Sequence, residues 1–181
     1  MAVDLALSPW TDADLDIELR ANVPEMTEFL GGPEPEEAIR ARHRRFLELP
    51  VSGTGQMLRI DLPGAPGAGS VGYWEREWRG GTVYEMGWHV LPEFQGRGVA
   101  SAAVRLAAGH AAVHGRHRYA HAYPKTAHAA SNAVCRKAGF ELLGEVDFEY
   151  PKGTMIRSCD WRLDLRSLAA VEVSSATGDN G

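Results

Sequence analysis

The segment between residues 84 and 101 constrains the fold more than any other stretch, because a strand, a glycine turn and a helix follow one another there. Alternation along Tyr84–Val90 predicts the strand, and the alanine-rich residues 99–113 predict the helix. Between them stand Gly96 and Gly98. Since glycine has no side chain, successive N–H groups of such a turn can converge on an anion at the positive end of the helix. The segment therefore predicts a phosphate or pyrophosphate site.

Two common phosphate-binding motifs do not fit this spacing. A Walker loop needs Lys and Ser or Thr after its last glycine, whereas Val99 and Ala100 follow Gly98. A dinucleotide fingerprint needs an acidic residue about 20 positions further on, and residues 116–126 contain neither Asp nor Glu. What remains is the pattern Gln-x-x-Gly-x-Ala, which begins at Gln95.

The rest of the chain predicts one α/β domain with a mixed sheet and helices on its faces. Its 181 residues suit a single core better than two. Thr11 and Asp14 have the spacing of a capping box at a helix start, and we expect turns at 63–67 and at Gly80-Gly81. We expect strands at 3–7, 56–62, 70–78, 82–90, 117–123, 140–150 and 154–165, helices at 11–21, 24–30, 33–47, 99–113 and 129–137, and a flexible tail at 167–181.

Composition and charge exclude several classes of protein. A net charge of −5 argues against broad nucleic-acid binding. No apolar run approaches the length of a membrane span and no signal sequence opens the chain, so we expect a cytoplasmic protein without a membrane partner. Two cysteines cannot form a disulfide framework. The histidines form no complete ligand set, so we expect no metal; they are His110, His114, His117 and His121.

A second segment, Ser131–Phe140, indicates the same protein family as the glycine loop. Ser131–Phe140 ends in Lys-x-Gly-Phe, and together with the loop it resembles the GCN5-related N-acetyltransferase (GNAT) superfamily. Tyr84–Gly87 and Pro24–Gly32 are most similar to its RimJ/RimL-like branch, which acetylates the N-termini of ribosomal proteins. The resemblance implies the GNAT fold, a mixed sheet of about seven strands in which the fourth and fifth strands splay apart. It places an acetyltransferase domain at residues 1–166.

The resemblance also implies acetyl-coenzyme A (acetyl-CoA) as co-substrate. The pyrophosphate would bind the backbone amides of the glycine loop, and the pantetheine arm would bind backbone groups of the preceding strand. His128 stands where the family usually has an asparagine that contacts the pantetheine. The residues implied for the cofactor are His89, Val90, Leu91, Gln95, Gly96, Arg97, Gly98, Val99, Ala100, Ser101, His128 and Asn132.

Acetyl transfer to an amine needs a proton acceptor and a group that stabilises the leaving thiolate. Glu85 matches a family position for the base, and by strand alternation it shares one face with His89, the second candidate. The family's usual tyrosine is replaced by Cys135. Ser131 lies four residues earlier on the same helical face and matches a serine proposed as proton donor in the ribosomal-protein branch. Both Ser131 and Cys135 stay open as donors.

We therefore expect an N-acetyltransferase that moves an acetyl group directly to a primary amine in a ternary complex. The alternative is a CoA-binding sensor or interaction module of the same fold without catalytic activity. The acceptor is left open among a peptide N-terminus, an aminoglycoside-like compound, a polyamine and an amino acid, and the chain is expected to be a monomer or homodimer. Residues 22–37 and 148–154 are the expected acceptor loops.

Overall fold

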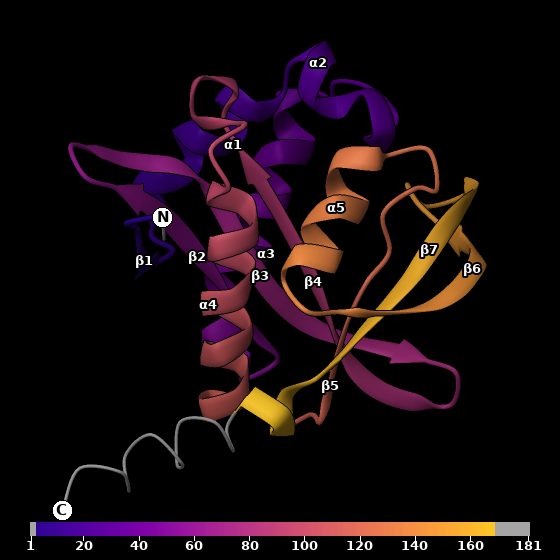
Figure 1. The fold of residues 1–181 in the computed structure, drawn as a ribbon. Coiled ribbons are helices and arrows are strands. Elements are labelled where there is room, and N and C mark those ends of the chain that lie inside the picture. Colours follow the sequence, from indigo (N-terminus) through magenta and orange to yellow (C-terminus); the bar gives the residue numbers. More distant parts are fainter. Residues whose placement is uncertain (1–2, 169–181) are drawn as a thin grey trace, which may run out of the picture.

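A computed structural model describes residues 3–168 as one sheet of seven strands with helices on both faces (Figure 1). The strands are β1 (Ala6–Pro9), β2 (Gly55–Leu62), β3 (Ala65–Trp78), β4 (Gly81–Val90), β5 (Tyr119–Ala122), β6 (Glu141–Glu149) and β7 (Met155–Asp164). The α-helices are α1 (Leu15–Ala21), α2 (Pro24–Thr27), α3 (Glu36–Ser52), α4 (Val99–His114) and α5 (Ala129–Lys137), and the 3-10 turns are η1 (Asp12–Asp14), η2 (Glu28–Leu30) and η3 (Pro92–Phe94).

The strands lie in the order β1-β2-β3-β4-β5-β7-β6. Neighbouring strands are antiparallel except for β4 and β5, which are parallel because α4 connects them as a crossover helix. The mixed sheet that the sequence predicts is therefore confirmed.

The two faces of the sheet carry different helices. Successive residues of a strand point to opposite faces, as Met57 and Leu58 of β2 do. Leu58 belongs to the main core, which α4 covers with alanines and valines such as Val104. Met57 belongs to a second cluster with Ile17 of α1, against which Phe46 of α3 packs. One face of the sheet is thus covered by α4, with α5 packed beside it on the same core, and the other by α1 and α3.

The parallel strands β4 and β5 separate after a very short contact. Their register contains only the pairs Tyr84↔Ala120 and Glu85↔His121. Beyond β5 the chain reaches Pro124, which has no N–H to continue the ladder. Residues 86–90 of β4 therefore lack a partner strand on this side, and the sheet opens in a V, as the family resemblance implies (Figure 1).

Several local predictions can be compared with the structure directly. The capping box is present, because Asp14 Oδ2 accepts hydrogen bonds from the N–H (2.7 Å) and hydroxyl (2.8 Å) of Thr11. The expected turn at 63–67 is wrong in length, since β3 begins at Ala65 and only two residues form the hairpin.

The second expected turn, at Gly80-Gly81, is wrong by one residue. The turn is Arg79-Gly80, with φ angles of 50° and 82°, and this pair of positive φ angles matches the twist of a two-residue hairpin.

Most of the expected tail, from residue 169 onward, lies outside the described residues, and residues 165–168 form one helical turn. Within the described part of the chain, no helix is long and apolar enough to span a membrane.

Candidate active site

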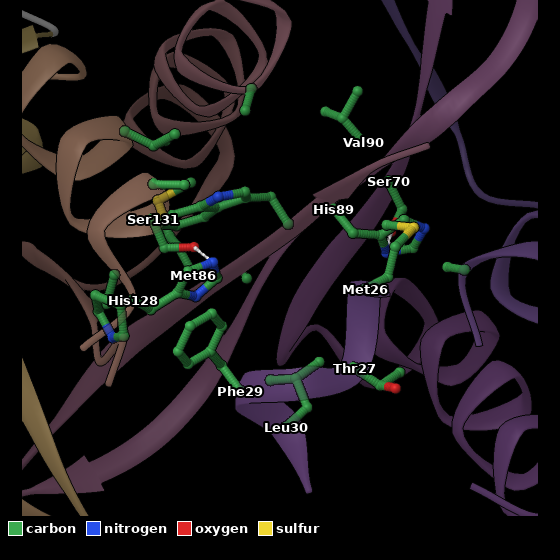
Figure 2. A pocket seen from close by; sticks show the side chains of 18 of the residues that line it. Met26, Thr27, Phe29, Leu30, Ser70, Met86, His89, Val90, His128 and Ser131 are labelled. Carbon is green, nitrogen blue, oxygen red and sulfur yellow. Dashed lines mark hydrogen bonds between the residues drawn. The ribbon is translucent and has the colours of Figure 1, made fainter. Parts of the chain in front are cut away.

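A cavity of about 910 Å³ occupies the opening between β4 and β5. One wall comes from the segment that contains α2 and η2, and the opposite wall from α5, as Figure 2 shows for Phe29 and Leu30 against His128 and Ser131. The floor is β4 from Glu85 to Val90. Both expected acceptor loops reach this cavity, with lining residues that include Asn22, Met26, Thr27, Glu34, Phe148 and Tyr150.

The end of β4 presents free backbone groups to the cavity. The N–H of Leu91 donates to Ala68 O at 2.9 Å, so Leu91 and, by alternation, His89 direct their backbone groups toward β3. Trp88 and Val90 consequently direct theirs toward the gap. The carbonyl of Val90 accepts a hydrogen bond from Gln95 Nε2 at 2.8 Å. Of the three residues expected around the pantetheine arm, only Val90 has its backbone amide on the cavity side.

The glycine loop forms a left-handed turn into α4. Gly96 and Gly98 have φ angles of 73° and 78°, and Gly98 is the N-cap of the helix. The first N–H groups of a helix have no intrahelical partner, and no acidic residue lies in the first turn of α4. Arg97 is exposed and donates to Glu93 O at 3.0 Å, so its guanidinium folds back on the loop. The loop can thus hold an anion with backbone groups alone.

The side chains of this loop differ in exposure. Val99 and Ser101 are buried, whereas Ala100 is partly exposed. Gln95, Gly96, Gly98, Val99, Ala100 and Ser101 all line the cavity. Leu91 and Arg97 do not contribute to its lining. The structure therefore brings six of the seven predicted loop residues to one place.

Glu85 lies at the point where the V opens. Its Oε2 accepts hydrogen bonds from Arg76 Nη1 at 2.8 Å and from Trp74 Nε1 at 3.3 Å. Burial raises the pKa of Glu85, and the charge and hydrogen bond of Arg76 oppose that shift. Among the described residues no donor contacts the other carboxylate oxygen, Oε1. Glu85 is therefore an anchored carboxylate with one oxygen available to a ligand.

Arg76 is held by aromatic rings as well as by Glu85. Its guanidinium carbon lies 4.2 Å from the centre of the Phe148 ring and 5.5 Å from that of Tyr123. A cation above an aromatic face is attracted by the ring quadrupole. Tyr123, which directly follows β5, and Phe148 of β6 thereby fix the ion pair of β3 and β4, which keeps the Glu85 carboxylate in one place.

His89 belongs to a separate polar network. Its Nδ1 lies 3.1 Å from Ser70 Oγ and 3.6 Å from Glu18 Oε1, and Glu18 pairs with Arg42 at 3.3 Å. Burial lowers the pKa of His89. Figure 2 shows Met26 against His89 and Ser70. Glu18 is 5% exposed and lines the cavity, although nothing in its sequence context marks it as more than a helix residue.

The opposite wall carries Ser131 and His128 at the start of α5. Ser131 Oγ lies 3.4 Å from His128 Nε2, and the imidazole stacks on Phe29 with ring centres 4.2 Å apart. Burial lowers the pKa of His128, opposed by the charge of Glu28. Both side chains line the cavity (Figure 2).

Besides Leu91 and Arg97, two more predicted residues do not line the cavity. Cys135 is 0% exposed in the main core, and burial raises its pKa to about 12. Asn132 is buried as well: it accepts a hydrogen bond from Trp161 Nε1 at 2.8 Å and donates to the carbonyls of Lys125 and His128. Asn132 thus connects α5 to β7, and neither residue takes part in the site proposed below.

The histidines considered for a metal are not brought together. His110 and His114 are neighbours on α4, whereas His121 pairs with Asp160 inside the sheet, with 2.6 Å between Nδ1 and Oδ1. Within residues 3–168, no group of three or more His, Cys, Asp or Glu side chains has the arrangement of a metal site.

Comparison with known proteins agrees with this geometry. Residues 4–141 match the sequence profile of the family described as Acetyltransferase (GNAT) domain. The chain belongs to the GNAT acetyltransferase family. This membership confirms the resemblance seen in the sequence and the expected class of acyltransferase. No curated protein shows a significant match to this GNAT acetyltransferase.

Solved structures show the same fold at low identity. An acetyltransferase from Salmonella typhimurium that modifies the N-terminal serine of ribosomal protein L7/L12 is 19% identical, with a TM-score of 0.72 over 88% of this chain and 94% of that one. An aminoglycoside acetyltransferase in complex with coenzyme A is 16% identical, with a TM-score of 0.73 and coverages of 93% and 98%. Spermidine N-acetyltransferase from Vibrio cholerae, with CoA and spermine, is 14% identical, with a TM-score of 0.73 and coverages of 91% and 98%.

Proposed function

We propose that this GNAT acetyltransferase transfers an acetyl group from acetyl-CoA directly to a primary amine, with Glu85 as the general base. The observation that carries the proposal is the position of Glu85, which lies in the cavity at the apex of the V, with no donor from residues 3–168 at Oε1. Acetyl-CoA supplies the activated acetyl thioester. The alternative of a CoA-binding sensor predicts no turnover, and the test below separates the two.

The chain has groups suited to each part of acetyl-CoA. The amides of residues 96–100 suit the pyrophosphate, because they converge at the N-terminus of the 16-residue helix α4. The amides of Trp88 and Val90 suit the pantetheine arm and the thioester carbonyl, since they face the gap. An N–H aimed at that carbonyl stabilises the negative charge that develops on its oxygen during attack.

Glu85 would accept the proton that the amine loses as it attacks the carbonyl, directly or through water. Its raised pKa suits this role, because a base works best when its pKa approaches the working pH. Arg76 and Trp74 hold the other oxygen, so the carboxylate needs no rearrangement before it reacts. His89 is the less suitable base, because its Nδ1 already faces Ser70 and Glu18.

The acceptor half of the cavity favours an amine that carries positive charge in solution. Glu18, Glu34 and Glu85 line it, and Arg42 is the basic side chain among them. Arg42 pairs with both Glu18 and Glu34, and Arg76 pairs with Glu85, so two guanidinium groups face three carboxylates. The similar structures act on ribosomal protein, aminoglycoside and spermidine, according to their descriptions. We therefore propose a small amine or a peptide N-terminus as acceptor.

The test is Glu85→Gln, assayed by release of free CoA thiol with a panel of amines. We expect the rate to fall by about 100-fold or more, the typical contribution of a general base, while the dissociation constant for CoA stays within about twofold. Glu141→Gln is the matched control, because Glu141 is an exposed strand carboxylate paired with Arg162. An unchanged rate in Glu85→Gln removes Glu85 as the base. Absence of thiol release from the unmodified protein with every amine favours the sensor.

A further inference from the structure

We propose that His128 provides, through the hydroxyl of Ser131, the proton that the leaving thiolate of CoA takes up. The inference rests on the proposed acetyl transfer and assigns its second half, the departure of the thiol. Ser131 is the group in contact with the sulfur, and His128 acts through it as a positioning residue and proton source.

The geometry places the two side chains as a pair on one wall of the cavity. His128 precedes α5, Ser131 lies in its first turn, and 3.4 Å separate Nε2 from Oγ (Figure 2). Both residues line the wall that α5 forms, whereas Glu85, which receives the amine proton, lies on the floor formed by β4. The amine would thus lose its proton at the floor of the cavity, and the thiolate would gain one at the α5 wall.

The leaving thiolate needs a proton source, and the position where the family usually has a tyrosine, Cys135 here, offers none. Cys135 is enclosed by the main core, with its thiol pKa raised to about 12. Thr27 uses its hydroxyl on its own helix, donating to Val23 O at 2.8 Å, and the hydroxyl of Ser70 faces Glu18 and His89. Tyr150 also lines the cavity, but the charges that act on its phenol are those of the acceptor side.

Ser131 alone is a poor acid, so its hydroxyl must be supplied with a proton as it gives one away. An imidazolium at His128 can do this, because it donates from Nε2 and becomes a neutral imidazole. Four groups face this imidazole or share its part of the cavity wall. They are Phe29 and Glu28 from η2, Lys125 from the loop before α5, and Ser131 itself.

The carbon–sulfur bond of the tetrahedral adduct breaks, and its electron pair stays on sulfur. Sulfur then takes the proton of Ser131 Oγ, and Oγ takes the proton of His128 Nε2. The products are the acetylated amine, the thiol form of CoA and neutral His128, which regains its proton from water. An amine that arrives as an ammonium ion first loses one proton to water. Glu85 then releases the second amine proton to water and His128 takes one back, so the reaction of an ammonium ion releases one proton overall.

The proposal predicts the pH dependence of kcat. Activity needs Glu85 unprotonated and His128 protonated, which gives a bell-shaped profile. The pKa of Glu85 is raised and that of His128 is lowered, both by burial, so the two limbs approach each other. The pH of maximal kcat should therefore be lower than it would be if His128 had the ordinary pKa of a histidine.

The kinetic test compares His128→Asn and Ser131→Ala with the unmodified protein at saturating acceptor. We expect kcat to fall by about 10- to 100-fold in both variants, and the alkaline limb assigned to His128 to disappear from both profiles. Tyr150→Phe is the matched control and should keep the alkaline limb. Loss of that limb in Tyr150→Phe alone would assign the donor to Tyr150 and overturn the proposal.

A second readout does not depend on turnover. Histidine-selective ¹⁵N spectra of the protein give the pKa of His128, with His128→Asn identifying its signals. We expect this pKa to be higher by about half a unit or more with CoA than with desulfo-CoA, which lacks the sulfur. Ser131→Ala should abolish the difference.

Equal pKa values with the two ligands would overturn the role of His128, whatever the activity. A failure of the proposed function would look different, because Glu85→Gln would then leave the rate unchanged or no amine would be acetylated.

Discussion

Replacing Arg76 tests how the site sets the proton affinity of its base. Arg76 Nη1 lies 2.8 Å from Glu85 Oε2, and neither side chain is more than a third exposed. An opposite charge this close lowers a carboxyl pKa by about 1 to 3 units. Each unit corresponds to about 1.4 kcal/mol. In Arg76→Gln this charge is removed while Glu85 stays desolvated. The pKa of Glu85 should therefore rise by about 1 to 3 units.

The assay is the pH dependence of kcat at saturating acceptor. Because Glu85 must be unprotonated to act, the acid limb should move to higher pH by about 1 to 3 units in Arg76→Gln. Arg76→Lys, which keeps the charge, should move it less. Phe148→Leu removes the ring beneath the guanidinium and should give an intermediate shift. The reasoning is refuted by an acid limb that stays in place in Arg76→Gln while Glu85→Gln abolishes activity.

Stability gives an independent check on the same variant. An acid whose pKa is raised by folding binds more protons when folded, so its contribution to stability is lost as pH rises through that pKa. Arg76→Gln leaves a buried carboxylate unpaired above this pH, and the rise of its pKa by about 1 to 3 units corresponds to a loss of about 1.4–4 kcal/mol. Urea unfolding should therefore show a deficit that is small at acid pH and grows toward pH 8. The double variant with Glu85→Gln should recover most of it.

Two further predictions concern the anion loop and the sheet. Gly96→Ala and Gly64→Ala place a side chain at the same φ of 73° with nothing within 4 Å, so both should cost about 1 kcal/mol of stability, but only Gly96→Ala should weaken CoA binding in calorimetry. Asp160→Asn should lower the unfolding free energy by about 3–5 kcal/mol at pH 7, because Asp160 is buried against His121 and Trp78. Because the pKa of Asp160 is lowered, that deficit should shrink as pH falls through it, and a deficit independent of pH would contradict the lowered pKa.

Local signals in the sequence were enough to predict much of the fold. Hydrophobic period, capping residues and glycine turns gave the order of elements, and the family resemblance gave the splayed strands. The local error that most affects the site was at the β3–β4 hairpin. A turn centred on Gly80-Gly81 would pair Glu85 with Arg76, whereas the turn at Arg79-Gly80 pairs it with Trp74. Arg79 takes a φ of 50° there, a conformation that the sequence suggests only for glycine.

Residues of the site that depend on distant segments could not be predicted. Glu18 reaches the cavity because α1 packs against β3, where it meets Ser70, 52 positions away in the chain. In the sequence, Arg76 is simply an arginine within the expected strand 70–78. Its stacking on Phe148 depends on where β6 lies in the sheet. No local pattern encodes such contacts, because strand order and helix packing determine them.

Cys135 lies on the predicted helix four residues after Ser131, yet it does not lie in the site with Ser131. Residues four apart on a helix differ by about 40° around its axis, so they share a face without pointing in the same direction. On α5 that rotation is enough to place Ser131 in the cavity and Cys135 in the main core. His128 is the N-cap that precedes the helix, and its ring stacks on Phe29, which keeps it at the cavity. The proton source for the thiolate should therefore be sought toward the start of α5, where the helix faces the opening between β4 and β5.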